Sequence, residues 1–186
     1  MPKIITFTGA SGTGKSTLAK ELLNNPHFSL ITSITTRPPR PSDLAGEYQY
    51  LSLEEFAFRN NQHQFIWKTT YAQNCYGTTF ASIDKASAAS VGEYSIMILV
   101  PEVVPILVEY VGKNIVQHFF IKSPPLPILK ERMQRRGDSP ETIEHRLHDV
   151  EQWESNALNS GVEYLLLDND QEVNDTLKWI YHKLKP

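Results

Sequence analysis

The chain has 186 residues, of which 40% are hydrophobic and 21% charged, which suffices for one domain with a sizeable core. Its 18 basic and 21 acidic side chains give a formal net charge of −3, which excludes a general attraction to nucleic acids or anionic membranes. The single cysteine, Cys75, excludes an internal disulfide and fits a reducing compartment. Without a leader or an apolar run long enough to span a bilayer, the sequence indicates a cytoplasmic protein.

The most informative motif lies between an apolar strand at 3–8 and a helix at 16–23. Glycines at positions 9 and 14, followed by Lys15 and Ser16, match the pattern of a phosphate-binding loop. Backbone N–H groups at the helix N-terminus would hold a polyphosphate, Lys15 would reach its β- and γ-phosphates, and the Ser16 hydroxyl would bind Mg²⁺. An ordinary glycine-rich turn is the alternative, but the complete motif and both flanks favour the loop. The residues expected to bind ATP are Gly9, Ala10, Ser11, Gly12, Thr13, Gly14, Lys15, Ser16 and Thr17.

The rest of the chain alternates apolar strands with helices. Strands that are apolar throughout are typical of a sheet covered on both faces, so the pattern predicts an α/β fold with a five-stranded parallel sheet flanked by helices. The expected strands span 3–8, 28–32, 94–100, 115–121 and 164–167, and the later helices span 101–110, 126–136, 140–158 and 172–184.

Residues 37–91 have a different pattern and interrupt the expected core of 1–36 and 92–186. Segments 47–51 and 64–71 are typical of short antiparallel strands, and a helix between them begins with Ser52 and Glu55 as a capping box. We interpret this segment as a small inserted subdomain that binds the acceptor.

A basic helix end is followed by a turn and a new helix within residues 132–146. Arginines there can close over phosphates, so we interpret the segment as a lid.

Taken together, these motifs resemble the guanylate kinases over nearly the whole chain. The resemblance rests on the phosphate loop, residues 35–41, Tyr48, residues 76–78, the lid arginines and a last strand ending at 168–170. It implies a single domain with a P-loop kinase core, an acceptor subdomain and a lid, which moves the γ-phosphoryl group of ATP to GMP with Mg²⁺ as cofactor. By this resemblance the acceptor-binding residues are Ser33, Arg37, Arg40, Tyr48, Trp67, Tyr76 and Thr78, and the catalytic residues are Lys15, Arg132, Arg136 and Arg146.

The chain departs from this family where guanine is read. Trp67 stands where guanylate kinases have a glutamate that accepts hydrogen bonds from guanine, and Ile98 and Val100 replace aspartates. Since a charged hydrogen bond contributes about 1.5–3 kcal/mol, we expect GMP to be a poor acceptor. Trp67 either stacks on another base, fills the pocket for a smaller phosphorylated sugar, or packs in the subdomain core, and the sequence leaves these alternatives open.

The favoured hypothesis is an ATP-dependent kinase that acts on a small phosphorylated acceptor, either GMP or another nucleoside monophosphate. The alternatives are a kinase of ribose bisphosphate-type sugar phosphates and a non-catalytic guanylate kinase-like binding module. Such modules tend to lose the phosphate loop, whereas Lys15 and Ser16 are intact here. We expect no nucleic-acid or membrane partner, and a homodimer stays open.

Overall fold

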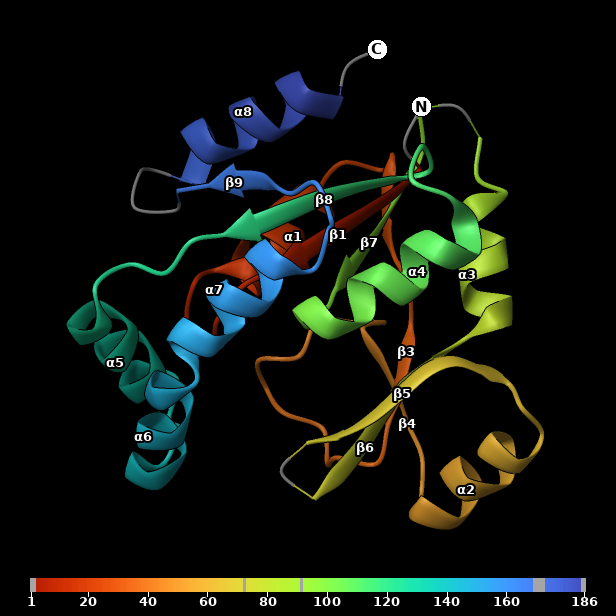
Figure 1. Ribbon diagram of the computed structural model, residues 1–186, viewed down its shortest axis with the longest axis horizontal. Coiled ribbons are helices and arrows are strands. Elements are labelled where there is room, and N and C mark those ends of the chain that lie inside the picture. The colour runs from red at the N-terminus through yellow and green to blue at the C-terminus, as the bar shows by residue number, and fades with distance from the viewer. Residues whose placement is uncertain (1–2, 72, 91, 169–172, 185–186) are drawn as a thin grey trace.

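The computed structural model describes residues 3–71, 73–90, 92–168 and 173–184, and its core is a five-stranded sheet (Figure 1). The strand order is β2-β7-β1-β8-β9, and every neighbouring pair is parallel, which confirms the predicted sheet. The strands are β1 (Ile4–Thr8), β2 (Phe28–Leu30), β7 (Tyr94–Ile98), β8 (Val116–Ile121) and β9 (Leu165–Leu167). Of the predicted segments at the C-terminus, residues 169, 170 and 172 lie outside the described ranges.

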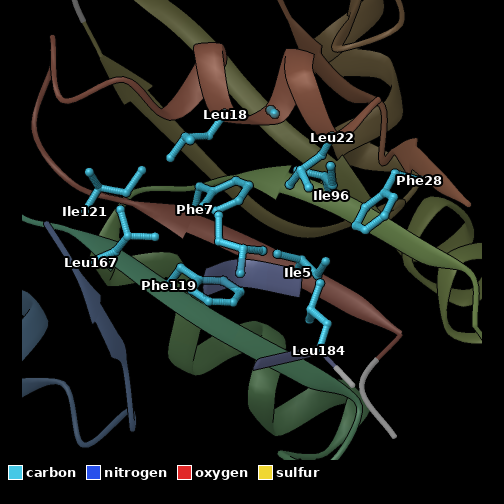
Figure 2. Packing of buried hydrophobic residues seen from close by; sticks show 12 residues of the cluster. Ile5, Phe7, Leu18, Leu22, Phe28, Ile96, Phe119, Ile121, Leu167 and Leu184 are labelled. Carbon is cyan, nitrogen blue, oxygen red and sulfur yellow. The ribbon is translucent and has the colours of Figure 1, made fainter. Parts of the chain in front are cut away.

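Helices cover both faces of this sheet, and β1 is therefore buried on both sides. Ile5 and Phe7 pack with α1 (Lys15–Leu22) and α8 (Val173–Leu184), in the cluster that Figure 2 shows. Ile4, on the other face, belongs to a second cluster with residues of α3 and α4. These helices are α3 (Phe80–Ser87) and α4 (Val104–Val111), and the 3₁₀ turn η1 (Pro101–Val103) precedes α4.

The helix expected over 140–158 was wrong in one respect, because the structure divides it into α6 (Pro140–His148) and α7 (Val150–Asn159). At the junction, Asp149 has a ψ of −9°, far enough from the helical value to tilt the second helix away from the first. Helix α6 therefore lies beside α5 (Leu126–Arg135), while α7 runs back toward the core sheet (Figure 1). No helix in the described part of the chain is long and apolar enough to cross a membrane.

A second sheet of four strands, in the order β4-β3-β6-β5, lies below the core sheet in the view of Figure 1. The pairs β3/β6 and β5/β6 are antiparallel, as expected for this subdomain, but β4 runs parallel to β3. The long connection between β3 and β4 carries the chain back to the same end of the sheet, which makes the parallel pairing possible. The strands are β3 (Ser33–Thr35), β4 (Tyr48–Tyr50), β5 (Phe65–Tyr71) and β6 (Asn74–Thr79).

Helix α2 (Leu53–Asn61) joins β4 to β5 and has the predicted capping box. The Ser52 hydroxyl accepts from the Glu55 backbone N–H at 3.1 Å, and the Glu55 carboxylate accepts from the Ser52 N–H at 2.9 Å. Phe56 of α2 stacks on Phe65 of β5 with ring centroids 4.6 Å apart. The helix therefore covers one face of the second sheet and leaves the other face for the site.

Buried His118 gives a prediction for stability against pH. It lies in β8, 5% exposed, with Nδ1 2.8 Å from the Thr6 hydroxyl, and burial lowers the pKa of its ring to about 4. Between pH 6.5 and about 4 the unfolded chain binds a proton that the folded chain does not, so stability falls as the pH falls. We expect the free energy of unfolding, measured in urea, to fall by about 3 kcal/mol over this pH range because of His118. This loss should be absent in His118→Gln. Equal pH dependence of the two proteins would contradict it.

Candidate active site

The phosphate loop connects β1 to α1 through backbone angles that only glycine adopts freely. Gly9 has a φ of +141°, and a Cβ at this position would collide with the carbonyl oxygen of Ile121. Gly14 has a φ of +101° and caps the N-terminus of α1. The Lys15 ammonium group donates to the carbonyl oxygens of Gly9 at 2.7 Å and Ala10 at 2.6 Å. The loop therefore folds around its own lysine, as a phosphate cradle requires.

Three arginines of the predicted lid segment contact this loop: Arg132 from α5, Arg136 directly after α5, and Arg146 from α6. Arg132 donates to the carbonyl oxygen of Gly12 at 3.2 Å. Arg136 and Arg146 both donate to the Ser11 hydroxyl, at 3.0 and 3.4 Å. Three arginines of segment 132–146, which is far from the loop in the sequence, thus lie beside residues 9–15.

Asp138 is a residue of this cluster that the sequence did not single out. Its carboxylate accepts from Arg146 at 2.7 Å and also pairs with Arg136. An acidic residue inside the basic segment 132–146 was the only signal for it in the sequence. Because it bridges two arginines, Asp138 holds them in position beside the loop.

The positive charges at the loop outweigh the nearby negative ones. Burial, followed by the charges of Arg136 and Arg146, lowers the pKa of Lys15 to about 7, and only Glu47 acts against this shift. A buried lysine with two arginines beside it favours a ligand with several negative charges. Such a ligand would restore the full charge of Lys15.

Ser16 lies in the first turn of α1 with its side chain exposed, and Thr17 is exposed beside it. Thr13 is buried, and its hydroxyl donates to the Ala10 carbonyl at 3.0 Å. Within the described ranges, no group of three or more His, Cys, Asp or Glu side chains could hold a metal ion. The exposed Ser16 hydroxyl beside the loop fits Mg²⁺ that arrives with a polyphosphate, with one serine ligand and the remaining oxygens from phosphate and water.

One face of the second sheet carries a row of predicted acceptor residues. The register pairs Ser33 with Tyr48 across β3/β4, and Thr78 with Trp67 across β6/β5. The Ser33 and Thr78 hydroxyls lie 2.8 Å apart and join the two pairs. Because directly paired residues point to the same face, all four side chains line one row.

The next row on the same face contains Tyr76, which pairs with Thr35 on one side and Thr69 on the other. The rings of Tyr48 and Tyr76 meet edge to face at 6.3 Å, which places both hydroxyl-bearing rings together. Burial and the Glu47 carboxylate raise the pKa of Tyr48, so its hydroxyl stays neutral and can donate.

Arg37 lies next to these tyrosines and is only 5% exposed. Its guanidinium donates to Asp43 at 2.8 Å and to the Pro38 carbonyl at 2.7 Å, and it lies 5.3 Å above the Tyr48 ring. Arg40 has an exposed side chain, and its backbone N–H donates to Asp43 at 2.7 Å. The structure therefore brings Arg37, Tyr48 and Tyr76 together and leaves Arg40 at the rim.

Asp43 is a second carboxylate that sequence reasoning missed. Besides Arg37 it accepts from the Tyr50 hydroxyl at 2.7 Å. Burial raises the pKa of Asp43, but the hydrogen bonds from Arg37 and Tyr50 outweigh burial and leave the pKa below its ordinary value. The proline-rich turn that follows Arg40 was the only signal, because a short acid in a turn often binds nearby donors.

Trp67 reaches this face because β5 has a bulge. The register shifts between Phe65, which pairs with Thr79, and Trp67, which pairs with Thr78. Since Thr78 and Thr79 point to opposite faces, so do Trp67 and Phe65. Trp67 is partly buried against the second core cluster, where Val100 also packs, and its indole Nε1 is buried without a hydrogen-bond partner among the described residues.

Comparisons with known proteins agree with this arrangement. Residues 1–185 match the family model described as guanylate kinase. A guanylate kinase of Chelativorans sp. is 32% identical over 90% of this chain and 76% of its own length. A guanylate kinase of Synechocystis sp. is also 32% identical, over 98% of this chain and 91% of its own length. The crystal structure of guanylate kinase from Anaplasma phagocytophilum, 20% identical, has the same fold with a TM-score of 0.72 over 97% and 83% of the chains.

The phosphate loop on a parallel sheet, with arginines gathered over it, defines a P-loop kinase. Within that class, the chain belongs to the guanylate kinase family and is an ATP-dependent kinase. Members of this family act on nucleoside monophosphates.

The Arg37–Asp43 pair gives a prediction for stability. The two side chains are 6% and 13% exposed, so Asp43→Ala would leave a buried guanidinium without its counter-ion. We expect a loss of about 3 kcal/mol in the free energy of unfolding, measured in urea at pH 7. The matched control is Asp175→Ala, which breaks the exposed pair with Lys178 and should change stability by less than about 1 kcal/mol. Equal losses in the two variants would show that the buried pair is not needed for stability.

Proposed function

We propose that this protein transfers the γ-phosphoryl group of ATP to the phosphate of a nucleoside monophosphate, giving ADP and the nucleoside diphosphate. The observation that carries the proposal is the gathering of Lys15, Arg132, Arg136 and Arg146 around the loop at 9–15. A lysine at the N-terminus of α1 and three arginines from the end of α5 and from α6 form a site for a polyphosphate.

The donor nucleotide would place its phosphates within this loop. Backbone N–H groups of residues 9–17 would donate to phosphate oxygens, and Lys15 would turn from its carbonyl partners to the β- and γ-phosphates. Ser16 would hold Mg²⁺, which would neutralise charge on the phosphates.

The acceptor phosphate would bind at the other group of predicted residues. Arg37 offers a guanidinium that Asp43 already holds in place, and Tyr48 and Tyr76 offer hydroxyls beside it. Exposed Arg40 would complete the shell once a phosphate is present.

Transfer requires the acceptor oxygen to attack the γ-phosphorus while the ADP oxygen leaves. The protein's contribution is positioning and charge stabilisation, since phosphoryl transfer needs little covalent help. Arg132, Arg136 and Arg146 would neutralise charge on the moving group, and residues 132–146 would act as a lid that excludes water. The charge balance and the single cysteine support a cytoplasmic location.

Lys15→Ala tests the donor site. No other loop residue carries a positive charge to the β/γ-phosphates, so we expect turnover to fall by at least ~100-fold with an unchanged melting temperature. The control is Lys20→Ala in the same helix, which removes an exposed ammonium and should leave turnover unchanged. Near wild-type turnover in a folded Lys15→Ala protein would refute the kinase mechanism.

Arg37→Ala and Arg40→Ala test the acceptor site. The assay is ADP formation with AMP, GMP, CMP, UMP and ribose 1,5-bisphosphate, and the best acceptor is then used for kinetics. We expect the acceptor KM to rise by ~10-fold or more while the ATP KM stays within about twofold, because the donor loop is a separate element. Exposed Arg59 of α2 lies outside the site, so Arg59→Ala should change neither constant. If the ATP KM rose instead, these arginines would belong to the donor site.

A further inference from the structure

The row Tyr48–Ser33–Thr78–Trp67 places three kinds of polar group along one line of the second sheet. Tyr48 lies at the end next to Arg37, where the acceptor phosphate would bind. Ser33 and Thr78 satisfy one another in the middle, and Trp67 is at the other end. A nucleotide with its phosphate at Tyr48 would therefore bring its base to Ser33, Thr78 and Trp67.

The indole N–H of Trp67 is the unsatisfied group in this row. Its nitrogen is buried and has no partner among the described residues, and a buried donor without an acceptor destabilises a protein. Buried polar groups are almost always paired, so an unpaired one beside a binding face points to a ligand atom as its partner. That ligand atom must be an acceptor, because an indole can only donate.

Guanine does not offer such an atom at this position. The edge of guanine that faces a glutamate in guanylate kinases consists of N–H donors, and two donors cannot pair. Adenine presents a ring nitrogen, N1, as an acceptor, with an exocyclic amine on one side and a C–H on the other. The Ser33 and Thr78 hydroxyls can accept from the amine, and the apolar side chain of Val100, in the same cluster as Trp67, suits the C–H.

We propose that Trp67 makes this site specific for adenosine monophosphate, by donating its indole N–H to N1 of the adenine ring. The inference rests on the proposed function, because it takes the acceptor phosphate to lie at Arg37. Trp67 is thus a specificity-determining residue that selects the base through a donor instead of a carboxylate.

The first test changes the acceptor and leaves the protein intact. AMP, 1-deaza-AMP, CMP and GMP are compared with ATP as donor, and 1-deaza-AMP lacks only the ring nitrogen in question. We expect kcat/KM for AMP to exceed that for GMP by at least ~100-fold and that for 1-deaza-AMP by ~10-fold. A higher value for GMP or CMP, or equal values for AMP and its 1-deaza analogue, would overturn the proposal.

The second test pairs that analogue with Trp67→Phe, which keeps an aromatic ring and removes the N–H. In this variant AMP and 1-deaza-AMP should become equal acceptors, since the group that tells them apart is gone. Loss of packing would weaken both acceptors alike, so the ratio separates the hydrogen bond from a general defect. The control Trp179→Phe, in α8, should keep the wild-type ratio. A preference for AMP that persists in Trp67→Phe would assign the discrimination to another residue.

A third test needs no turnover and separates failure of the inference from failure of the proposed function. The indole N–H resonances of the ¹⁵N-labelled protein are recorded with AMP or GMP alone, and Trp67→Phe assigns the signal of Trp67. A downfield shift of that signal with AMP and not with GMP supports the inference even if no acceptor is phosphorylated, in which case only the proposed reaction fails. An indole signal of Trp67 that does not move with saturating AMP would overturn the inference. If such a protein still phosphorylated GMP efficiently, the proposed kinase reaction would be supported and only the inference would fail.

Trp67→Glu restores the carboxylate of the family and reverses the expected preference in part. We expect kcat/KM for GMP to rise by ~10-fold or more and that for AMP to fall. The gain should be incomplete, because Ile98 and Val100 still replace the family's aspartates. No gain for GMP would mean that Trp67 does not face the base.

Discussion

The turn from β1 into α1 is the constraint on which the rest of the site depends. The chain leaves a strand that is buried on both faces and must enter a helix within a few residues, with its N–H groups free for an anion. At Gly9 the backbone passes so close to the Ile121 carbonyl that no side chain fits. This contact ties the loop to β8. The chain continues from β8 to α5, which supplies Arg132. The position of the loop and the position of segment 132–146 are therefore fixed by the same sheet.

Two carboxylates hold the arginines of the site before any phosphate is present. Asp138 pairs with Arg136 and Arg146 at the loop, and Asp43 pairs with Arg37 at the second sheet. Burial, followed by the charges of Arg136 and Arg146, lowers the pKa of Lys15, and carboxylate partners offset the repulsion between such neighbouring cations. The carboxylates also limit where each guanidinium can point. An arriving phosphate thus meets donors that have already lost most of their conformational freedom, which reduces the entropy lost on binding.

A single irregularity in β5 decides which aromatic side chain lies on the face proposed to bind the acceptor. Without the bulge between Phe65 and Trp67, these two residues would share one face of the strand. With it, Phe65 packs on α2, and Trp67 joins the row with Ser33 and Thr78. The bulge therefore places Phe65 in the core of the subdomain and Trp67 beside the proposed site, on opposite faces of the strand.

The parallel core, the phosphate loop and the capping box of α2 could be predicted from local spacing in the sequence. The signals were apolar strands, glycines at 9 and 14, and Ser52 with Glu55. The strands β3 and β6 were not predicted, since their polar residues resemble loop, and their stability comes from pairing with distant segments. The same holds for the break at Asp149, and for Asp43 and Asp138, whose partners are chosen by packing. The indole N–H of Trp67, unpaired among the described residues, follows only from the tertiary structure, because the strand register and the surrounding core determine which atoms surround the indole.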